Sequence, residues 1–121
     1  MKFAFFGTPD FAAIVLRSLL RQGLAPSAVI ANPDRPTGRK QVITPPPTKK
    51  LILEERPEIP VLQPKALAEI KEALQDLNAD VFVVAAYAKI IPKTILDIPR
   101  RGTLGVHPSL LPSYRGPTPI R

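Results

Sequence analysis

A short apolar run that passes directly into a helix start constrains the fold of this chain more than any other feature. Residues 2–6 (KFAFF) are typical of a buried strand, and Gly-Thr-Pro-Asp follows at once. Thr8 is a good N-cap, and Pro9 suits the first helical position. Asp10 favours the positive end of a helix. These residues predict a strand followed immediately by a helix.

The predicted helix has one apolar face and a clear end. Phe11, Val15 and Leu19 repeat every four residues, and Gly23 is placed to end the helix. Residues 27–31 (SAVIA) have the pattern of a second strand. Strand, helix and strand in succession predict a βαβ unit with a right-handed crossover between parallel strands.

The regular pattern is lost over residues 32–50. This stretch holds five prolines and five basic residues, which predicts a long loop. Long loops in compact domains usually carry function or are disordered.

Helical and strand patterns alternate again after this loop, and the alternation predicts an α/β fold with an open, doubly wound, mostly parallel sheet. Ligands of such sheets bind beyond the carboxyl ends of the strands. The expected elements are a short helix over 49–56, a strand over 61–63, an amphipathic helix over 67–77 ending near Asn78, a strand over 81–86 covered on both faces, a helical turn over 92–96 and a strand over 103–106.

The composition limits the function classes. A chain of 121 residues with 45% hydrophobic residues is expected to be one domain with its own core. It has no cysteine and one histidine, which argues against disulfides and makes a transition-metal site improbable. No apolar run is long enough to span a membrane or to act as a signal peptide, so we expect a cytoplasmic protein.

The net charge of +7 is unevenly distributed. Residues 1–50 carry +6, residues 51–98 carry −3 and residues 99–121 carry +4. Two basic zones around an acidic middle are compatible with an anionic partner, and equally with a basic protein that has none.

The two strongest motifs are ambiguous when each is taken alone. "FFGTPDF" has a single glycine, so it predicts a capped strand-to-helix turn rather than a dinucleotide site, although a helix N-terminus can hold an anion. The only histidine, His107, follows the strand over 103–106 at the edge where ligands are expected, or lies in a surface turn. Ser109 is too close to it in sequence, and without a nucleophile elbow, to suggest a serine hydrolase.

Taken together, the motifs resemble the tetrahydrofolate-dependent formyltransferases. The hallmark segment of that family reads roughly N-x-H-x-S-L-L-P-x-x-x-G, and this chain has "HPSLLPSYRG" from residue 107. "FFGTPDFA", "PDRPTGR", "VLQP", "ADVFVVAAYAKIIP" and "RRGTLGVHPSLLPSYRGPTPI" are similar to consecutive family blocks and occur in the same order. The resemblance covers nearly all 121 residues, and "PDRPTGR" is similar to members that act on initiator tRNA.

The resemblance implies a Rossmann-like fold, formyl transfer from 10-formyltetrahydrofolate to the amino group of methionyl initiator tRNA, and a role for each matching residue. His107 matches the catalytic histidine of the family. Arg35, Arg39 and Lys40 match a basic loop that contacts tRNA. The positions that match folate-contacting segments are Tyr87, Ala88, Ile90, Ile91, Ser109, Leu110, Leu111 and Pro112.

Two departures from the family pattern bear on activity. The family asparagine that donates to the formyl oxygen is Gly105 here. The family also has an aspartate further downstream, and Asp97 lies before the histidine and does not match it. We therefore expect residues 1–121 to be the N-terminal part of a catalytic domain truncated at its C-terminal side, weakly active or inactive alone, with the remainder and the tRNA-binding barrel absent.

Two other functions remain open from the sequence. The chain could act on a small amine such as a sugar nucleotide, because those N-formyltransferases share the His-x-Ser-Leu-Leu-Pro block. It could also be a non-enzymatic RNA-binding module that uses its basic segments. A sheet that ends near Val106 is expected to leave one edge exposed, which predicts a possible homodimer through that edge.

Overall fold

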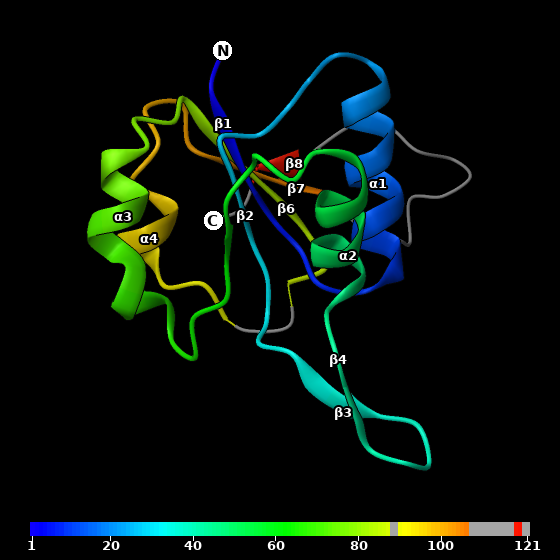
Figure 1. Ribbon diagram of the computed structural model, residues 1–121. Helices are drawn as coiled ribbons and strands as arrows, with labels where there is room; N and C mark the ends of the chain where they lie inside the picture. The colour runs from blue at the N-terminus through cyan, green and yellow to red at the C-terminus, as the bar shows by residue number, and fades with distance from the viewer. Residues whose placement is uncertain (88–89, 107–117, 120–121) are drawn as a thin grey trace.

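A six-stranded sheet lies at the centre of the computed structural model, which describes residues 1–87, 90–106 and 118–119 (Figure 1). Its strands are β1 (Phe3–Phe6), β2 (Ala28–Ile30), β5 (Val61–Leu62), β6 (Val81–Ala85), β7 (Thr103–Val106) and β8 (Thr118–Pro119). They lie in the order β5-β2-β1-β6-β7-β8, and only the β7–β8 pair is antiparallel. The predicted doubly wound, mostly parallel α/β fold is confirmed.

Helices cover both faces of this sheet (Figure 1). Helices α1 (Asp10–Arg21) and α2 (Pro47–Glu55) cover one face, whereas the 3-10 helix η1 (Leu67–Ile70), α3 (Lys71–Asp76) and α4 (Lys93–Leu96) cover the other. Among the described residues, none of these helices is long and apolar enough to cross a membrane.

The central strand β1 separates two hydrophobic cores because its side chains alternate between the two faces. Phe3 and Phe5 pack with residues of α1 and α2. Ala4 and Phe6 pack with residues of η1, α3 and α4. All four side chains are buried, which agrees with the buried strand predicted from KFAFF.

The helix that follows β1 begins differently from the prediction and ends as predicted. Its N-cap is Pro9, and no side chain caps the first turn, so the predicted N-cap role of Thr8 is wrong. At the other end Gly23 takes the left-handed conformation (φ 81°), and its N–H donates to the carbonyl of Leu20. The N–H of Leu24 donates to the carbonyl of Leu19, which completes a Schellman motif.

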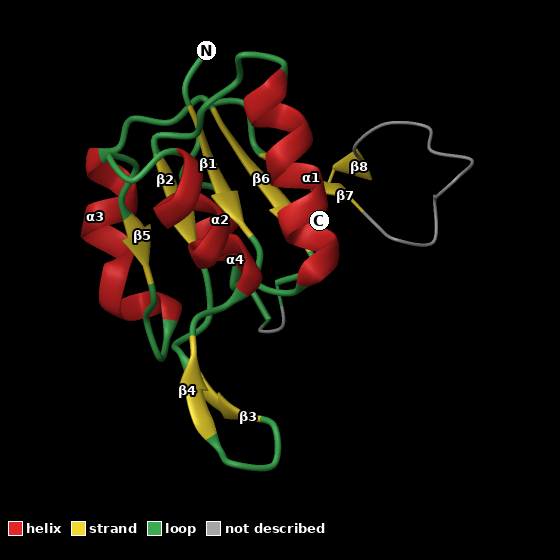
Figure 2. Cartoon of the chain, turned by 45° about the vertical axis from the view of Figure 1, so that its right-hand side comes forward, coloured by secondary structure: helices red, strands yellow, loops and turns green. Residues whose placement is uncertain are grey.

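The region predicted as a long loop contains a β-hairpin (Figure 2). Strand β3 (Arg35–Thr37) pairs antiparallel with β4 (Val42–Thr44). The prolines suggested a loop because proline cannot donate within a sheet, but Pro36 lies in a two-stranded ribbon that leaves outward-facing positions without ladder partners. The hydroxyls of Thr37 and Thr44 are also hydrogen-bonded across the pair at 2.6 Å.

Two predicted helices differ in detail from those observed. The amphipathic segment 67–77 is a 3-10 turn followed by the short helix α3, with Asn78 beyond it at a positive φ of 51°. Helix α2 begins two residues before the predicted Lys49, with a proline in its first turn, where the missing N–H costs nothing.

The edge of the sheet beyond β7 is not free, as the sequence had suggested. Strand β8 pairs with it, placing Thr118 opposite Gly105 and Pro119 opposite Leu104. The expectation of an exposed edge at β7 is therefore wrong, and the homodimer predicted from it lacks this structural basis.

Candidate active site

The segments that follow the parallel strands meet at one edge of the sheet, where the sequence predicted a site. We call this the carboxyl edge (residues 7–8, 31–34, 63–64 and 86–87). The N–H of Gly7 donates to the carbonyl of Ile30 at 2.9 Å, and the N–H of Ala31 donates to the carbonyl of Leu62 at 2.9 Å. The segments after β1 and β2 are thus each bonded to the end of the neighbouring strand along the carboxyl edge.

The turn after β1 leaves no space for a side chain at Gly7. A Cβ there would lie 2.5 Å from the Cβ of Ala12 and 2.6 Å from the carbonyl oxygen of Ala85. The hydroxyl of Thr48, which is fully buried, donates to the carbonyl of Gly7 at 2.8 Å. The backbone at Gly7 is therefore in close contact with α1, α2 and β6. The turn lies between β1 and β6, where the order of the strands along the chain reverses its direction across the sheet.

Thr8 links the first two strand ends instead of capping α1. Its Oγ1 accepts a hydrogen bond from the N–H of Asn32 at 3.1 Å. The side chain of Asn32 is buried, and its Oδ1 has no hydrogen-bond partner among the residues that the structure describes. A buried amide oxygen without a partner is costly, so this atom marks a place where a polar ligand or water would be stabilised.

Asp34, Lys49 and Gln63 form a polar group that we call the Asp34 cluster. Gln63 Nε2 donates to Asp34 Oδ1 at 2.6 Å and to the carbonyl of Asn32 at 3.1 Å. Lys49 Nζ lies 3.2 Å from Asp34 Oδ1 and 3.3 Å from Oδ2. The hydrogen bond from Gln63, with further help from Lys49, holds the pKa of Asp34 below its ordinary value.

The three basic residues predicted to contact tRNA lie on the hairpin beside this cluster. Arg35 is in β3, and Arg39 and Lys40 are in the turn between the two strands. All three are exposed, and Figures 1 and 2 show the hairpin extending away from the body of the protein. The fold therefore presents three cations on one projecting element.

The segment after β6 combines buried and exposed residues in a small space. The ring of Tyr87 meets that of Phe6 edge-on, with centroids 5.7 Å apart. Its hydroxyl is buried without a partner in the described ranges, and this burial raises its pKa. Ile90 is 94% exposed, whereas Ile91 packs against the core that contains Tyr87. Ala86 has a positive φ of 56°, which is strained for a residue with a Cβ.

Gly105 lies in β7 opposite Val84 of β6. Thr103, two residues earlier, donates its hydroxyl to the carbonyl of Leu96 in α4 at 2.8 Å. Because side chains alternate along a strand, a side chain at position 105 would lie on the α4 face, which also carries Tyr87.

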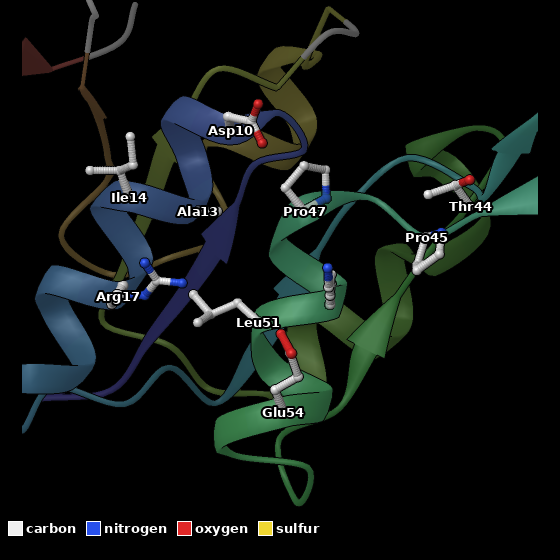
Figure 3. Close-up of a pocket in the computed structure, with 10 residues that line it drawn as sticks. Asp10, Ala13, Ile14, Arg17, Thr44, Pro45, Pro47, Leu51 and Glu54 are labelled. Carbon is white, nitrogen blue, oxygen red and sulfur yellow. The ribbon is translucent and has the colours of Figure 1, made fainter. Parts of the chain in front are cut away.

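A groove between α1 and α2 was not anticipated from the sequence (Figure 3). Its volume is about 520 Å³, and its rim carries both signs of charge, with Asp10 and Arg17 on α1 and Lys50 and Glu54 on α2. An ion pair at 3.6 Å between Arg17 of α1 and Glu55 of α2 joins the two helices. The groove lies on the α1 and α2 face, whereas Tyr87 and Ile91 pack on the opposite face of the sheet.

The site therefore combines satisfied and unsatisfied polar groups at the carboxyl edge. Comparison with known proteins shows the family to which the chain belongs. A family model described as formyl transferase matches residues 1–121. The chain belongs to the formyl transferase family.

Several curated relatives of the chain have the same name. A methionyl-tRNA formyltransferase of Halalkalibacterium halodurans is 48% identical over 123 residues, covering 99% of this chain and 38% of the relative. One from Citrifermentans bemidjiense is 48% identical over 122 residues with the same coverage. The chain thus spans less than two fifths of the length of these relatives.

Solved formyltransferase structures have the same fold. Glycinamide ribonucleotide transformylase 1 of Geobacillus kaustophilus matches with a TM-score of 0.61 at 22% identity, covering 95% of this chain and 62% of that one. The enzyme from Symbiobacterium toebii matches with a TM-score of 0.63 at 17% identity, covering 96% and 55%. At these identities the likeness establishes the fold alone.

Several predicted family positions fall outside the part of the chain that the structure describes. They are His107, Ala88, Ser109, Leu110, Leu111 and Pro112. Of the predicted folate residues, Tyr87 and Ile91 are brought into one core, while Ile90 faces solvent. Within the described residues, no group of three acidic or histidine side chains is placed to hold a metal ion.

The polar residues of the carboxyl edge were missed by the sequence reasoning. Asn32 and Asp34 follow β2, and Gln63 follows β5. The rule that ligands bind beyond the strand ends could have singled out these polar residues directly after apolar runs.

Proposed function

We propose that the whole protein transfers a formyl group from 10-formyltetrahydrofolate to the amino group of methionyl initiator tRNA, and that residues 1–121 are the N-terminal part of its catalytic domain. The observation that carries the proposal is the name shared by the curated relatives, together with a family match over the whole chain. A cytoplasmic location follows, because translation initiates there.

The reaction needs three things from the protein. The attacking amine must be neutral, the tetrahedral intermediate needs a donor for its oxyanion, and a proton must move from the amine to the leaving folate nitrogen. His107 is the candidate for proton transfer, because the imidazole pKa lies close to neutral pH.

The described residues suit the pterin part of the folate donor, which supplies the formyl group. The buried hydroxyl of Tyr87 and the Oδ1 of Asn32 lack partners within the described part of the chain, and a pterin offers N–H and carbonyl groups that could satisfy such atoms. Ile90, three residues after Tyr87, is an exposed apolar side chain suited to covering a flat ring. Ala88, Ile91 and residues 109–112 complete the proposed folate segment.

Basic residues on the hairpin support an RNA substrate. Arg35, Arg39 and Lys40 are exposed on one projecting element, where they could contact several phosphates at once. Replacing all three with alanine is expected to weaken tRNA binding and to reduce its dependence on salt, as measured by fluorescence anisotropy at several salt concentrations.

Position 105 offers the sharpest test of catalysis. In the full-length gene product, Gly105→Asn would restore the family donor, and one such donor is typically worth about 10²–10³ in rate. We expect a gain of that order in formylation of methionyl initiator tRNA, measured with a radiolabelled formyl donor.

A matched control is Gly102→Asn, just before β7. Gly102 has a φ of 85° with open space around it, and asparagine tolerates the left-handed region. The control should leave the rate unchanged. Equal rates for Gly105→Asn and the unchanged enzyme would mean that another group already supplies the donor at this site.

A second candidate function is RNA binding without catalysis, and the same two observations favour it. The hairpin is basic and exposed, and Gly105 lacks the donor side chain. Salt-dependent RNA binding by a full-length protein that formylates neither methionyl-tRNA nor small amines such as sugar nucleotides would establish this alternative. Formylation of a sugar nucleotide alone would instead identify a small-molecule enzyme.

A further inference from the structure

Within the part of the chain that the structure describes, the hairpin of β3 and β4 is held at its base. Every residue from 35 to 43 is exposed, and both ribbon views show the hairpin pointing away from the sheet and helices (Figures 1 and 2). Pairing between the two strands makes the hairpin a unit, but it does not determine the direction in which that unit points. The direction must be set where the hairpin joins the body.

The Asp34 cluster lies at that junction. Asp34 directly precedes β3, Lys49 lies in the first turn of α2 after β4, and Gln63 follows the edge strand β5. Its hydrogen bonds at 2.6 and 3.2 Å therefore connect the entry of the hairpin to its exit and to the sheet. The bond from Gln63 to the carbonyl of Asn32 attaches the same entry segment a second time.

The exit of the hairpin is fixed separately. Thr48, next to Lys49, is fully buried and donates to the carbonyl of Gly7. The exit thus has a fixed position in the core, and the entry is joined to it through Asp34. Removal of Asp34 would leave the entry with fewer restraints while the exit stayed in place.

We propose that Asp34 is a positioning residue that holds the basic hairpin in its RNA-binding direction through Lys49 and Gln63. The proposal rests on the proposed function in so far as the bound molecule is RNA. Asp34 itself contacts no RNA in this proposal, and it increases affinity although its charge is repelled by phosphate. A hairpin held in the binding direction loses less conformational entropy when it binds.

Replacing Asp34 distinguishes a positioning role from a purely electrostatic one, because the two predict opposite changes in RNA affinity. Asp34→Ala removes a negative charge beside three cations, so electrostatics alone would strengthen RNA binding. If the freed hairpin spends about one fifth of its time in the binding direction, the dissociation constant rises about fivefold instead. Glu72→Ala, at an exposed position of α3, makes the same charge change away from the hairpin and should not weaken binding.

A neutral variant gives an independent test. Gln63→Met removes both donated hydrogen bonds at similar side-chain length and leaves the net charge unchanged. We expect weaker RNA binding with an unchanged slope of log affinity against log salt, because the number of phosphate contacts is the same. A reduced slope would show lost contacts and would overturn the positioning role.

The direction of the hairpin can also be followed without RNA. Residues 1–121 contain no cysteine, so Val42→Cys on exposed β4, with any cysteine beyond residue 121 replaced by serine, gives one site for a nitroxide spin label. Asp34→Ala and Gln63→Met should each increase label mobility in the electron paramagnetic resonance spectrum, whereas Glu72→Ala should not. Unchanged mobility in both variants would overturn the proposal.

The two readouts keep this proposal distinct from the proposed function. If the unchanged protein shows no salt-dependent binding to tRNA, the proposed function fails and the RNA part of this proposal fails with it. The spin label still decides whether Asp34 orients the hairpin. If RNA binds but Asp34→Ala binds it as tightly or more tightly, the proposed function stands and the positioning role is wrong.

Discussion

The turns after β1 and β6 lie side by side at the carboxyl edge, but they are built in opposite ways. Both the N–H and the carbonyl of Gly7 have hydrogen-bond partners, and a Cβ at this residue would have no space. After β6, Ala86 is strained, the hydroxyl of Tyr87 is buried without a partner among the described residues, and Ile90 is almost fully exposed.

This difference suggests that the first turn serves the stability of the fold and the second serves ligand binding. A turn whose polar groups are satisfied within the protein has nothing left to offer a ligand, and its close packing fixes the elements around it. A turn that keeps an unsatisfied hydroxyl and an exposed apolar side chain loses stability, and a ligand can restore it. The first turn packs closely against the end of β6, the strand from which the second turn leaves.

The largest expected effect comes from breaking the packed turn. Gly7→Ala places a Cβ against the Cβ of Ala12 and the backbone carbonyl of Ala85, and the backbone cannot move aside without shifting β6. We expect a loss of about 3 kcal/mol in the free energy of unfolding, measured by urea denaturation.

Gly23→Ala is the matched control for this change. Nothing lies within 4 Å of a Cβ at Gly23, so only the left-handed backbone opposes alanine there, at about 1 kcal/mol. Equal losses for the two variants would show that crowding at Gly7 has no special role.

A smaller loss is expected from Thr48→Val. The substitution keeps the shape of the buried side chain but removes the donor to the carbonyl of Gly7, which is left without this partner. The free energy of unfolding should fall by about 2 kcal/mol in the same denaturation experiment. A neutral result would mean that water reaches the Gly7 carbonyl and that the first turn is less closed than its packing indicates.

The smallest change in stability, and one of opposite sign, is expected at the second turn. Tyr87→Phe removes a buried hydroxyl that has no partner in the described ranges, so the free protein should gain about 1 kcal/mol. Binding of a tetrahydrofolate analogue, measured by calorimetry, should weaken in the same variant. A loss of stability would show that the hydroxyl is already satisfied in the free protein.

Tyr87 should also make the free energy of unfolding depend on pH in the alkaline range. Burial raises the pKa of Tyr87 above its ordinary value of 10.0, so the unfolded chain loses this proton first as the pH rises. The free energy of unfolding is therefore not reduced by this group below pH 10.0, and it falls as the pH rises from there through the raised pKa. Tyr87→Phe should reduce this alkaline loss of stability.

The sequence was sufficient for the parts of the fold that depend on periodicity. KFAFF and VFVVAA predicted two central strands because buried parallel strands are continuously apolar, and Gly23 ended α1 as expected. Thr8 was misassigned because its hydroxyl has two possible uses, and the choice between capping α1 and binding Asn32 depends on where β2 ends.

Other features depend on contacts between segments that are distant in the chain. Asp34, Lys49 and Gln63 are separated by up to 29 residues, so no local pattern brings them together. The hairpin was hidden because its prolines resemble those of a loop, and its pairing involves only three residues on each strand. The roles of His107 and residues 109–112 stay predictions.

The opposite end of the sheet has a practical consequence. There Asp80 accepts a hydrogen bond from the N–H of Lys2 at 2.9 Å and pairs with Arg100 at 3.0 Å, which fastens the start of β1 beside the starts of β6 and β7. Met1 is 82% exposed beyond this tie, and Figure 1 shows the N-terminus at the end of the molecule remote from the hairpin. A biosensor surface coupled through Met1 would therefore leave the carboxyl edge and hairpin facing the injected RNA.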